Sequence, residues 1–352
     1  MKITISTETI KPMIKICERL LEKENVMEEL EKLLEHEDYQ IEFERYDIIG
    51  GGRGGFSKEE FIQFFTHLHE LKYEDVDNTR LKMRLERYQY FLNNLDMYKE
   101  KIEMLEVITE EKVLKALEKT VAGLPNSVDF SDLKLIFSIG MGNSGGWFYK
   151  NYSHYDVIIF LENFNEEVML NTIAHEYHHV GINMLLSRIE DGNGSMEENF
   201  YRELAFEGLA IKYCNNYKGI LTKSIFDEAV NIGLDDNSYR YYVEEFEDVY
   251  KNFISDIMDT RSGKINNEEE FTKRFWQYWM STRSKRVKDN EPDDLSQSLN
   301  YFLGGDIWGL IHDVYGKDKV YELFENPKEF ASYYNKALKT IGRMDLEIPE
   351  LE

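Results

Sequence analysis

The sequence predicts a mainly α fold with one small β-sheet, an α+β arrangement. Apolar residues recur at helical spacing over most of the 352 residues. The two best strand candidates are residues 133–141 and 155–163, which are rich in aromatic and branched residues. Hydrophobic residues make up 42% of the chain and charged residues 31%, which is typical of a folded protein with a well-solvated surface.

The first third of the chain predicts helices only. A serine and a glutamate at residues 57 and 60 predict a capped helix start, and Gly123-Leu124-Pro125 predicts a helix end. The expected helices are two within residues 9–36, one at 57–71, a long one at 78–107, and one from 109 to 123. We therefore expect a helical N-terminal region, residues 1–129, which forms a cleft wall or a regulatory module, and a second domain at residues 130–352 that carries the chemistry.

Residues 165–189 predict a helix that carries the most informative motif. Acidic residues occupy its first turn, its apolar residues have near-helical spacing, and no proline interrupts it. The sequence HEYHH stands in its middle, at residues 175–179. A helix places the imidazoles of His175 and His179 on one face, with Glu176 beside them. Two imidazoles can bind zinc, and an adjacent glutamate can accept a proton from a water molecule that the ion activates.

A second helix, predicted from Ser195 onwards, offers a third metal ligand. Ser195 and Glu198 form a capping-box pattern just after a turn signal at residues 190–194. If the two helices form an antiparallel hairpin, a residue about twelve positions into the second faces the motif, because both rise about 1.5 Å per residue. Glu207 lies at that level. Glu203, one turn nearer to the loop, stays open as an alternative ligand or as a carboxylate that orients a ligand histidine.

The two helices resemble the gluzincin zinc metallopeptidases, in which HExxH is followed on a second helix by Glu-Gly-Leu-Ala, here residues 207–210. More narrowly, the chain resembles uncharacterised zinc-dependent peptidases known only as domains of unknown function. The resemblance covers roughly residues 130–340 and implies a zincin-like catalytic domain. It implies one zinc ion per chain, held by His175, His179 and Glu207, with Glu176 as general base. The sequence departs from the pattern at Ile211, where some gluzincins have an acid that supports a ligand histidine; Glu203 could take that role.

Residues 298–338 predict a helix, a turn at Gly316 and two shorter helices. The first of these helices resembles the Tyr-x-x-Gly helix that follows the metal site in such peptidases. The resemblance implies that Tyr301 donates a hydrogen bond to the developing oxyanion. A packing role is the competing interpretation, because the chain has 23 tyrosines and most are expected to pack.

A glycine-rich segment, residues 140–148, joins the two predicted strands. In metallopeptidases a strand of this kind pairs with an extended substrate, and glycine lets a peptide backbone approach closely. We therefore predict that the substrate cleft is lined by Gly140, Gly142, Gly145 and Gly146. A flexible hairpin loop is the alternative.

The net charge of −25 argues against nucleic acid as a partner, because phosphates require a positive surface, and it also disfavours anionic membranes. The N-terminus lacks the apolar core of a signal peptide, and the chain has no apolar run of membrane-spanning length. The two cysteines lie far apart and suggest no disulfide framework. We expect a cytoplasmic enzyme.

Three functions fit these observations. The first is a zinc-dependent metallopeptidase that acts on a peptide or protein substrate. The second is a zinc-dependent hydrolase of a non-peptide amide or ester, because activated water does not identify its substrate. The third is a non-enzymatic regulatory or binding protein with a vestigial site, against which the intact Glu176 counts.

Overall fold

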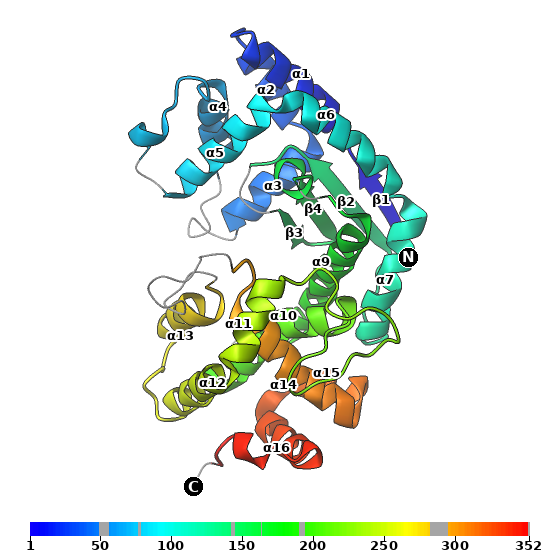
Figure 1. Cartoon of the computed structure of the whole chain (residues 1–352), viewed down its shortest axis with the longest axis vertical. Helices are drawn as coiled ribbons and strands as arrows, with labels where there is room; N and C mark the ends of the chain where they lie inside the picture. The colour runs from blue at the N-terminus through cyan, green and yellow to red at the C-terminus, as the bar shows by residue number, and fades with distance from the viewer. Residues whose placement is uncertain are drawn as a thin grey trace. The chain divides into compact units, whose positions relative to one another are not determined.

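The computed structural model describes residues 1–48, 56–76, 79–141, 145–162, 164–189, 194–281 and 295–350 (Figure 1). The chain is mainly helical with one four-stranded sheet, which confirms the predicted fold class. It divides into two compact units. Unit 1 comprises Met1–Ala116 and Phe130–Val180, and unit 2 comprises Leu117–Asp129 and Gly181–Glu352. The predicted division of the chain near residue 130 stays a prediction.

Unit 1 contains the sheet, whose strand order is β1-β2-β4-β3. The strands are β1 (Lys2–Ser6), β2 (Asp132–Ser138), β3 (Gly146–Tyr149) and β4 (Tyr152–Asp156). β1 and β4 both run parallel to β2, and β3 pairs antiparallel with β4. β1 was not predicted, because its partner β2 lies in a distant part of the sequence and supplies no local signal. β3 forms one edge of the described sheet.

The strand predicted at residues 155–163 is wrong over most of its length. The strand there is β4, which ends at Asp156. The side chain of Asp156 accepts a hydrogen bond from the backbone N–H of Ile158 at 3.0 Å and so caps a short helix, α8 (Val157–Phe160). The branched residues that suggested a strand are therefore buried in a helical turn.

The helices of unit 1 follow the predicted capping and periodicity in part, and the helix at Glu37–Ile48 was not predicted. Ser57 accepts from the backbone of Glu60 and Glu60 accepts from the backbone of Ser57, which confirms the capping box. The long helix expected at residues 78–107 is instead interrupted at Asn94. The helices are α1 (Ile10–Leu21), α2 (Met27–Leu34), α3 (Glu37–Ile48), α4 (Lys58–Thr66), α5 (Thr79–Asn93) and α6 (Leu95–Glu103), with short turns η2 (Tyr73–Asp75) and η3 (Met104–Val107).

Helix α3 covers one face of the sheet, where Ile41 packs with Ile136 and Trp147. The other face meets helix α9 (Glu166–Leu186), where the ring of Phe148 lies 5.1 Å from that of His179. The predicted motif helix is therefore seated directly against the edge strand β3. The division between the two units falls inside α9, after Val180.

Unit 2 is helical in its described part. Its centre is the pair α10 (Met196–Cys214) and α14 (Leu299–Tyr315), where the indole N–H of Trp308 donates to the backbone carbonyl of Tyr201 at 2.9 Å. The remaining helices are α11 (Asp236–Glu244), α12 (Phe246–Arg261), α13 (Glu268–Arg274), the π-helical turn η4 (Phe275–Trp279), α15 (Lys317–Glu325), η5 (Pro327–Glu329), α16 (Phe330–Ile341) and η6 (Met344–Leu346), with the end of α7 (Glu110–Gly123).

Among the helices within the described ranges, none has both the length and the apolar character that crossing a bilayer requires.

Candidate metal centre

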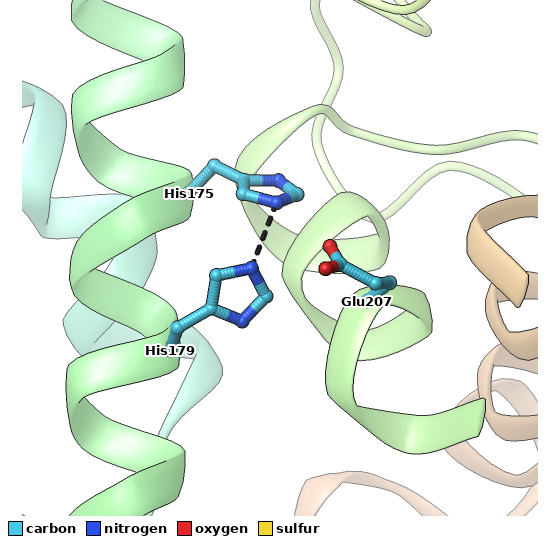
Figure 2. A group of neighbouring side chains, drawn as sticks. All are labelled: His175, His179 and Glu207. Carbon is cyan, nitrogen blue, oxygen red and sulfur yellow. Dashed lines mark hydrogen bonds between the residues drawn. The ribbon is translucent and has the colours of Figure 1, made fainter. Parts of the chain in front are cut away.

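Helix α9 brings the two motif histidines together. The Nε2 atoms of His175 and His179 lie 3.0 Å apart (Figure 2), and their ring centroids lie 4.7 Å apart. Both side chains are buried, His175 with 7% and His179 with 2% of its surface exposed. The four-residue spacing on a helix is the cause, because it stacks the two imidazoles on one face.

Helix α10 contributes a carboxylate to the same place. Ser195 caps the helix by accepting from the backbone N–H of Glu198 at 3.2 Å, as the sequence predicts. From this start, Glu207 lies three turns into α10, and its carboxylate points toward the two imidazoles (Figure 2). One ligand atom from each of His175, His179 and Glu207 lies within 4.8 Å of the others. In the described part of the chain, these three form a group that could hold a metal ion.

The three side chains suit zinc. Two nitrogen ligands at about 2.0 to 2.1 Å from a tetrahedral ion would lie about 3.3 Å apart, close to the observed separation of the two Nε2 atoms. Two histidines and one glutamate are a donor set found in catalytic zinc sites, which leave the fourth position open for water. The arrangement therefore needs only small side-chain adjustments to bind an ion.

Gly208, the residue after Glu207, allows α10 to pack closely against α14. A β-carbon on Gly208 would lie 2.1 Å from the carbonyl carbon of Gly304 on α14, and one on Gly304 would lie 2.0 Å from the carbonyl oxygen of Leu204. No side chain fits at this helix crossing. The Glu-Gly pair thus places a carboxylate and the contact of two helix backbones on adjacent residues of α10.

The predicted general base, Glu176, lies half-buried beside strand β3. A β-carbon on Gly146 would lie 3.8 Å from the Oε1 atom of Glu176 and 2.9 Å from the ring of Tyr155. Phe148, two residues further along β3, contacts His179. Because alternate residues of a strand share a face, Gly146 and Phe148 form the part of β3 that faces the motif.

The other glycines and Glu203 lie in different surroundings. The half-buried Gly145 precedes β3, and its carbonyl accepts from the backbone N–H of Asp156 at 3.0 Å. Gly140 is buried, and its carbonyl accepts a hydrogen bond from the hydroxyl of Tyr88. Gly142 lies outside the described residues. Glu203 is exposed and does not belong to the group of three potential ligands.

Tyr301 lies half-buried in the first turn of α14, the helix that packs against α10. Its neighbour on the chain, Asn300, donates to the sulfur of Met280. The predicted role of Tyr301 as an oxyanion donor stays a prediction.

The sequence did not point to Arg45, a buried polar residue of α3 on one face of the sheet. Arg45 is buried, and its guanidinium lies 4.7 Å from the ring centroid of Trp147. Burial lowers the pKa of Arg45, while the charges of Tyr46 and Glu176 act to raise it. Arg45 thus lies within electrostatic range of the candidate base. No local pattern marks this residue, because tertiary packing alone brings α3 and the motif together.

A helix that carries HExxH, a nearby buried group of two histidines and a glutamate, and a small sheet with its edge strand beside the motif together define a candidate metal-dependent hydrolase. The chain belongs to the family described as "Putative zinc dependent peptidase (DUF5700)", which matches residues 30–342. This confirms the predicted kinship with zinc peptidases. The matched region begins in α2, so the family includes most of the N-terminal helices as well as the motif helix. No curated protein and no solved structure matches the chain.

Proposed function

We propose that this protein is a zinc-dependent metallopeptidase of the gluzincin type. His175, His179 and Glu207 would hold one zinc ion per chain. The observation that carries the proposal is the convergence of these three side chains, with ligand atoms within 4.8 Å of one another. Membership of a family described as zinc-dependent peptidases supports the same conclusion.

When bound, zinc would lower the pKa of a water molecule and polarise the carbonyl group under attack. The task of Glu176 is to accept the proton of the attacking water and to pass it to the leaving amine. Its position fits this task, because it is adjacent to His175 in the sequence and its Oε1 atom would lie 3.8 Å from a β-carbon on Gly146 of β3.

The edge strand β3 supports a peptide as the substrate. β3 is hydrogen-bonded to β4 and forms the edge of the described sheet, so an extended peptide backbone could pair with its outer side. Gly145 and Gly146 present little side-chain bulk to such a peptide. Phe148, which contacts His179, would then pack against a substrate side chain close to the scissile bond. Tyr301 is the proposed donor to the oxyanion.

The test is peptide-library cleavage by zinc-loaded wild-type protein and the Glu176→Gln variant. We expect the wild type to cut peptides and the variant to lose at least about a hundredfold in kcat, because loss of general base catalysis typically costs 10² to 10⁴ in rate. Both proteins should contain the same amount of zinc. If zinc-loaded wild type cuts an amide or ester panel but no peptide, the peptidase assignment is wrong. If Glu176→Gln cuts as fast as the wild type, its assignment as base is wrong.

A further inference from the structure

Arg45 of α3 is a buried cation beside the edge strand β3, and both belong to unit 1. Its guanidinium carbon lies 4.7 Å from the ring centroid of Trp147 on β3 and 5.1 Å from that of Tyr46. Trp147 in turn stacks on the imidazole of His154, with ring centroids 4.4 Å apart and planes 17° apart. Aromatic rings therefore hold the guanidinium on the α3 face of β3.

The charge of Arg45 is incompletely compensated. Its Nε atom has no hydrogen-bond partner within the described part of the chain. Burial lowers the pKa of this side chain, against the charges of Tyr46, Glu176 and Glu42. Glu42 is mostly protonated near neutral pH, however, because burial and next the charge of Asp156 raise its pKa to about 8. Since a buried cation normally has an anionic partner in contact with it, this guanidinium can take one from a ligand.

Strand β3 presents alternate residues to the two faces of the sheet. Gly146 and Phe148 face the motif helix, whereas Trp147 between them faces α3 and contacts Arg45. A peptide that pairs with the outer side of β3 would alternate in the same way, so its side chains would point in turn toward α9 and toward α3. A side chain directly opposite Trp147 would begin about 5 Å from it. The guanidinium on the Trp147 ring is therefore within reach of a substrate side chain.

We propose that Arg45 is a specificity-determining residue, which binds a carboxylate group of the substrate on the α3 side of β3. A guanidinium matches a carboxylate in charge and in shape, because it can donate two parallel hydrogen bonds to the two oxygens. An acidic side chain and the C-terminus of a peptide that ends in the cleft both supply this group. The inference rests on the proposed peptidase function, because it takes the substrate to be a peptide that pairs with β3.

Matched peptide pairs test this assignment. One set of pairs differs only by glutamate or glutamine at one position near the cleavage site, and a second set differs only by a free or an amidated C-terminus, which tells the two sources apart. For zinc-loaded wild type we expect kcat/KM to favour the carboxylate member of at least one pair by about ten- to a hundredfold, the usual effect of a hydrogen bond to a charged group. A wild type that prefers neither kind of carboxylate would overturn the proposal.

Variants of Arg45 assign the preference to this residue. It should vanish in Arg45→Met and in the more polar Arg45→Gln, which serves if the methionine variant does not fold. It should persist in part in Arg45→Lys, which keeps the charge but not the two parallel donors. Arg240→Met removes the same charge from an exposed site on α11 and should keep the wild-type ratio. Because the net charge of −25 repels acidic peptides from the protein as a whole, long-range attraction cannot produce the preference. An equal preference in wild type and Arg45→Gln would refute the role of Arg45.

Peptide binding to zinc-loaded Glu176→Gln separates failure of this inference from failure of the peptidase assignment. Calorimetric titration needs no cleavage, and the Kd of the carboxylate peptide should be at least about tenfold lower than that of its partner in the pair. Adding Arg45→Gln to Glu176→Gln should make the two Kd values equal. If wild type cleaves no peptide but this difference is found, carboxylate binding by Arg45 stands and the function is wrong. If peptides are cleaved but Arg45 affects neither ratio, the inference is wrong and the function stands.

Discussion

Gly208 of α10 and Gly304 of α14 touch backbone to backbone, so closely that a β-carbon on Gly208 would lie 2.1 Å from the carbonyl carbon of Gly304. Glu207, the candidate third ligand, directly precedes this contact. The helix crossing therefore fixes both the axial position and the rotation of α10 relative to α14 next to Glu207. This close packing, and not backbone flexibility, explains why a glycine stands at position 208 in the Glu-Gly-Leu-Ala element.

The variant Gly208→Ala tests this explanation. The added methyl group must push α10 and α14 apart, because the atoms it meets belong to the backbone. We expect a loss of at least about 1 to 3 kcal/mol in unfolding free energy, which is typical of overpacking, together with weaker zinc binding. Urea unfolding and zinc titration measure the two effects. Gly263→Ala is the control: its site is open, with φ of +75°, so it should cost backbone strain alone and leave zinc binding unchanged.

The variant Gly146→Val should have lower peptidase activity than the wild type but bind the same amount of zinc. The side chain would meet the ring of Tyr155 and the carboxylate of Glu176, filling the space that the proposed substrate backbone needs. We expect kcat/KM to fall by an order of magnitude or more, since small displacements of a reacting group can cost about a hundredfold. Steady-state kinetics and zinc analysis provide the readouts.

Lys150→Ala is a suitable comparison for the change at Gly146, because Lys150 is an exposed residue just after β3 that pairs with Glu44. It should retain wild-type kcat/KM. Equal activity of Gly146→Val and the wild type would show that substrate does not pass over this part of β3.

His154 should make the protein sensitive to acid. It is fully buried, its Nε2 atom lies 2.7 Å from the hydroxyl of Ser138, and burial and then Arg45 lower its pKa to about 3. The unfolded chain takes up the proton near pH 6.5 while the folded chain does not. Above about pH 6.5 this histidine therefore does not reduce the free energy of unfolding. As the pH falls from there toward 3, it lowers the free energy of unfolding by about 1.4 kcal/mol per pH unit.

Urea unfolding between pH 4.5 and 7.5 tests this pH dependence in the wild type and in His154→Gln. The glutamine cannot ionise, so the variant should show a shallower loss of stability on acidification. Identical slopes would mean that the folded protein accommodates a protonated His154. The neighbouring Glu42 has the opposite effect, because its raised pKa makes stability decline as the pH rises from about 4.5 to about 8.

The parts of the structure that local sequence determines were predictable. Caps and apolar periodicity placed α9 and α10, and matching levels along the two helices brought Glu207 to His175 and His179. A helix depends on interactions within a few residues, and the rise per residue is constant, so a ligand could be sought by counting. That these residues bind zinc stays a prediction.

Features that depend on distant contacts were not predictable. β1 forms a strand because β2, which is distant in the sequence, offers it a partner. The strand predicted from Tyr155 failed for a local reason, since Asp156 caps a helical turn there and the aromatic and branched run concealed that signal. The carboxyl groups of Glu42 and Asp156 meet at Gly140 only in the folded chain. In the sequence, Glu42 is one glutamate among many.

We expect His175, His179 and Glu207 together to hold one zinc ion. Zinc analysis of the purified wild type, Glu207→Ala and Glu203→Ala tests it most directly, because the two glutamates lie one turn apart on α10 and only Glu207 belongs to the group of three. We expect one zinc per chain in the wild type and in Glu203→Ala, and a large loss of zinc affinity in Glu207→Ala. A metal-free wild type that does not take up added zinc, or a Glu207→Ala variant that binds zinc as tightly as the wild type, would contradict it.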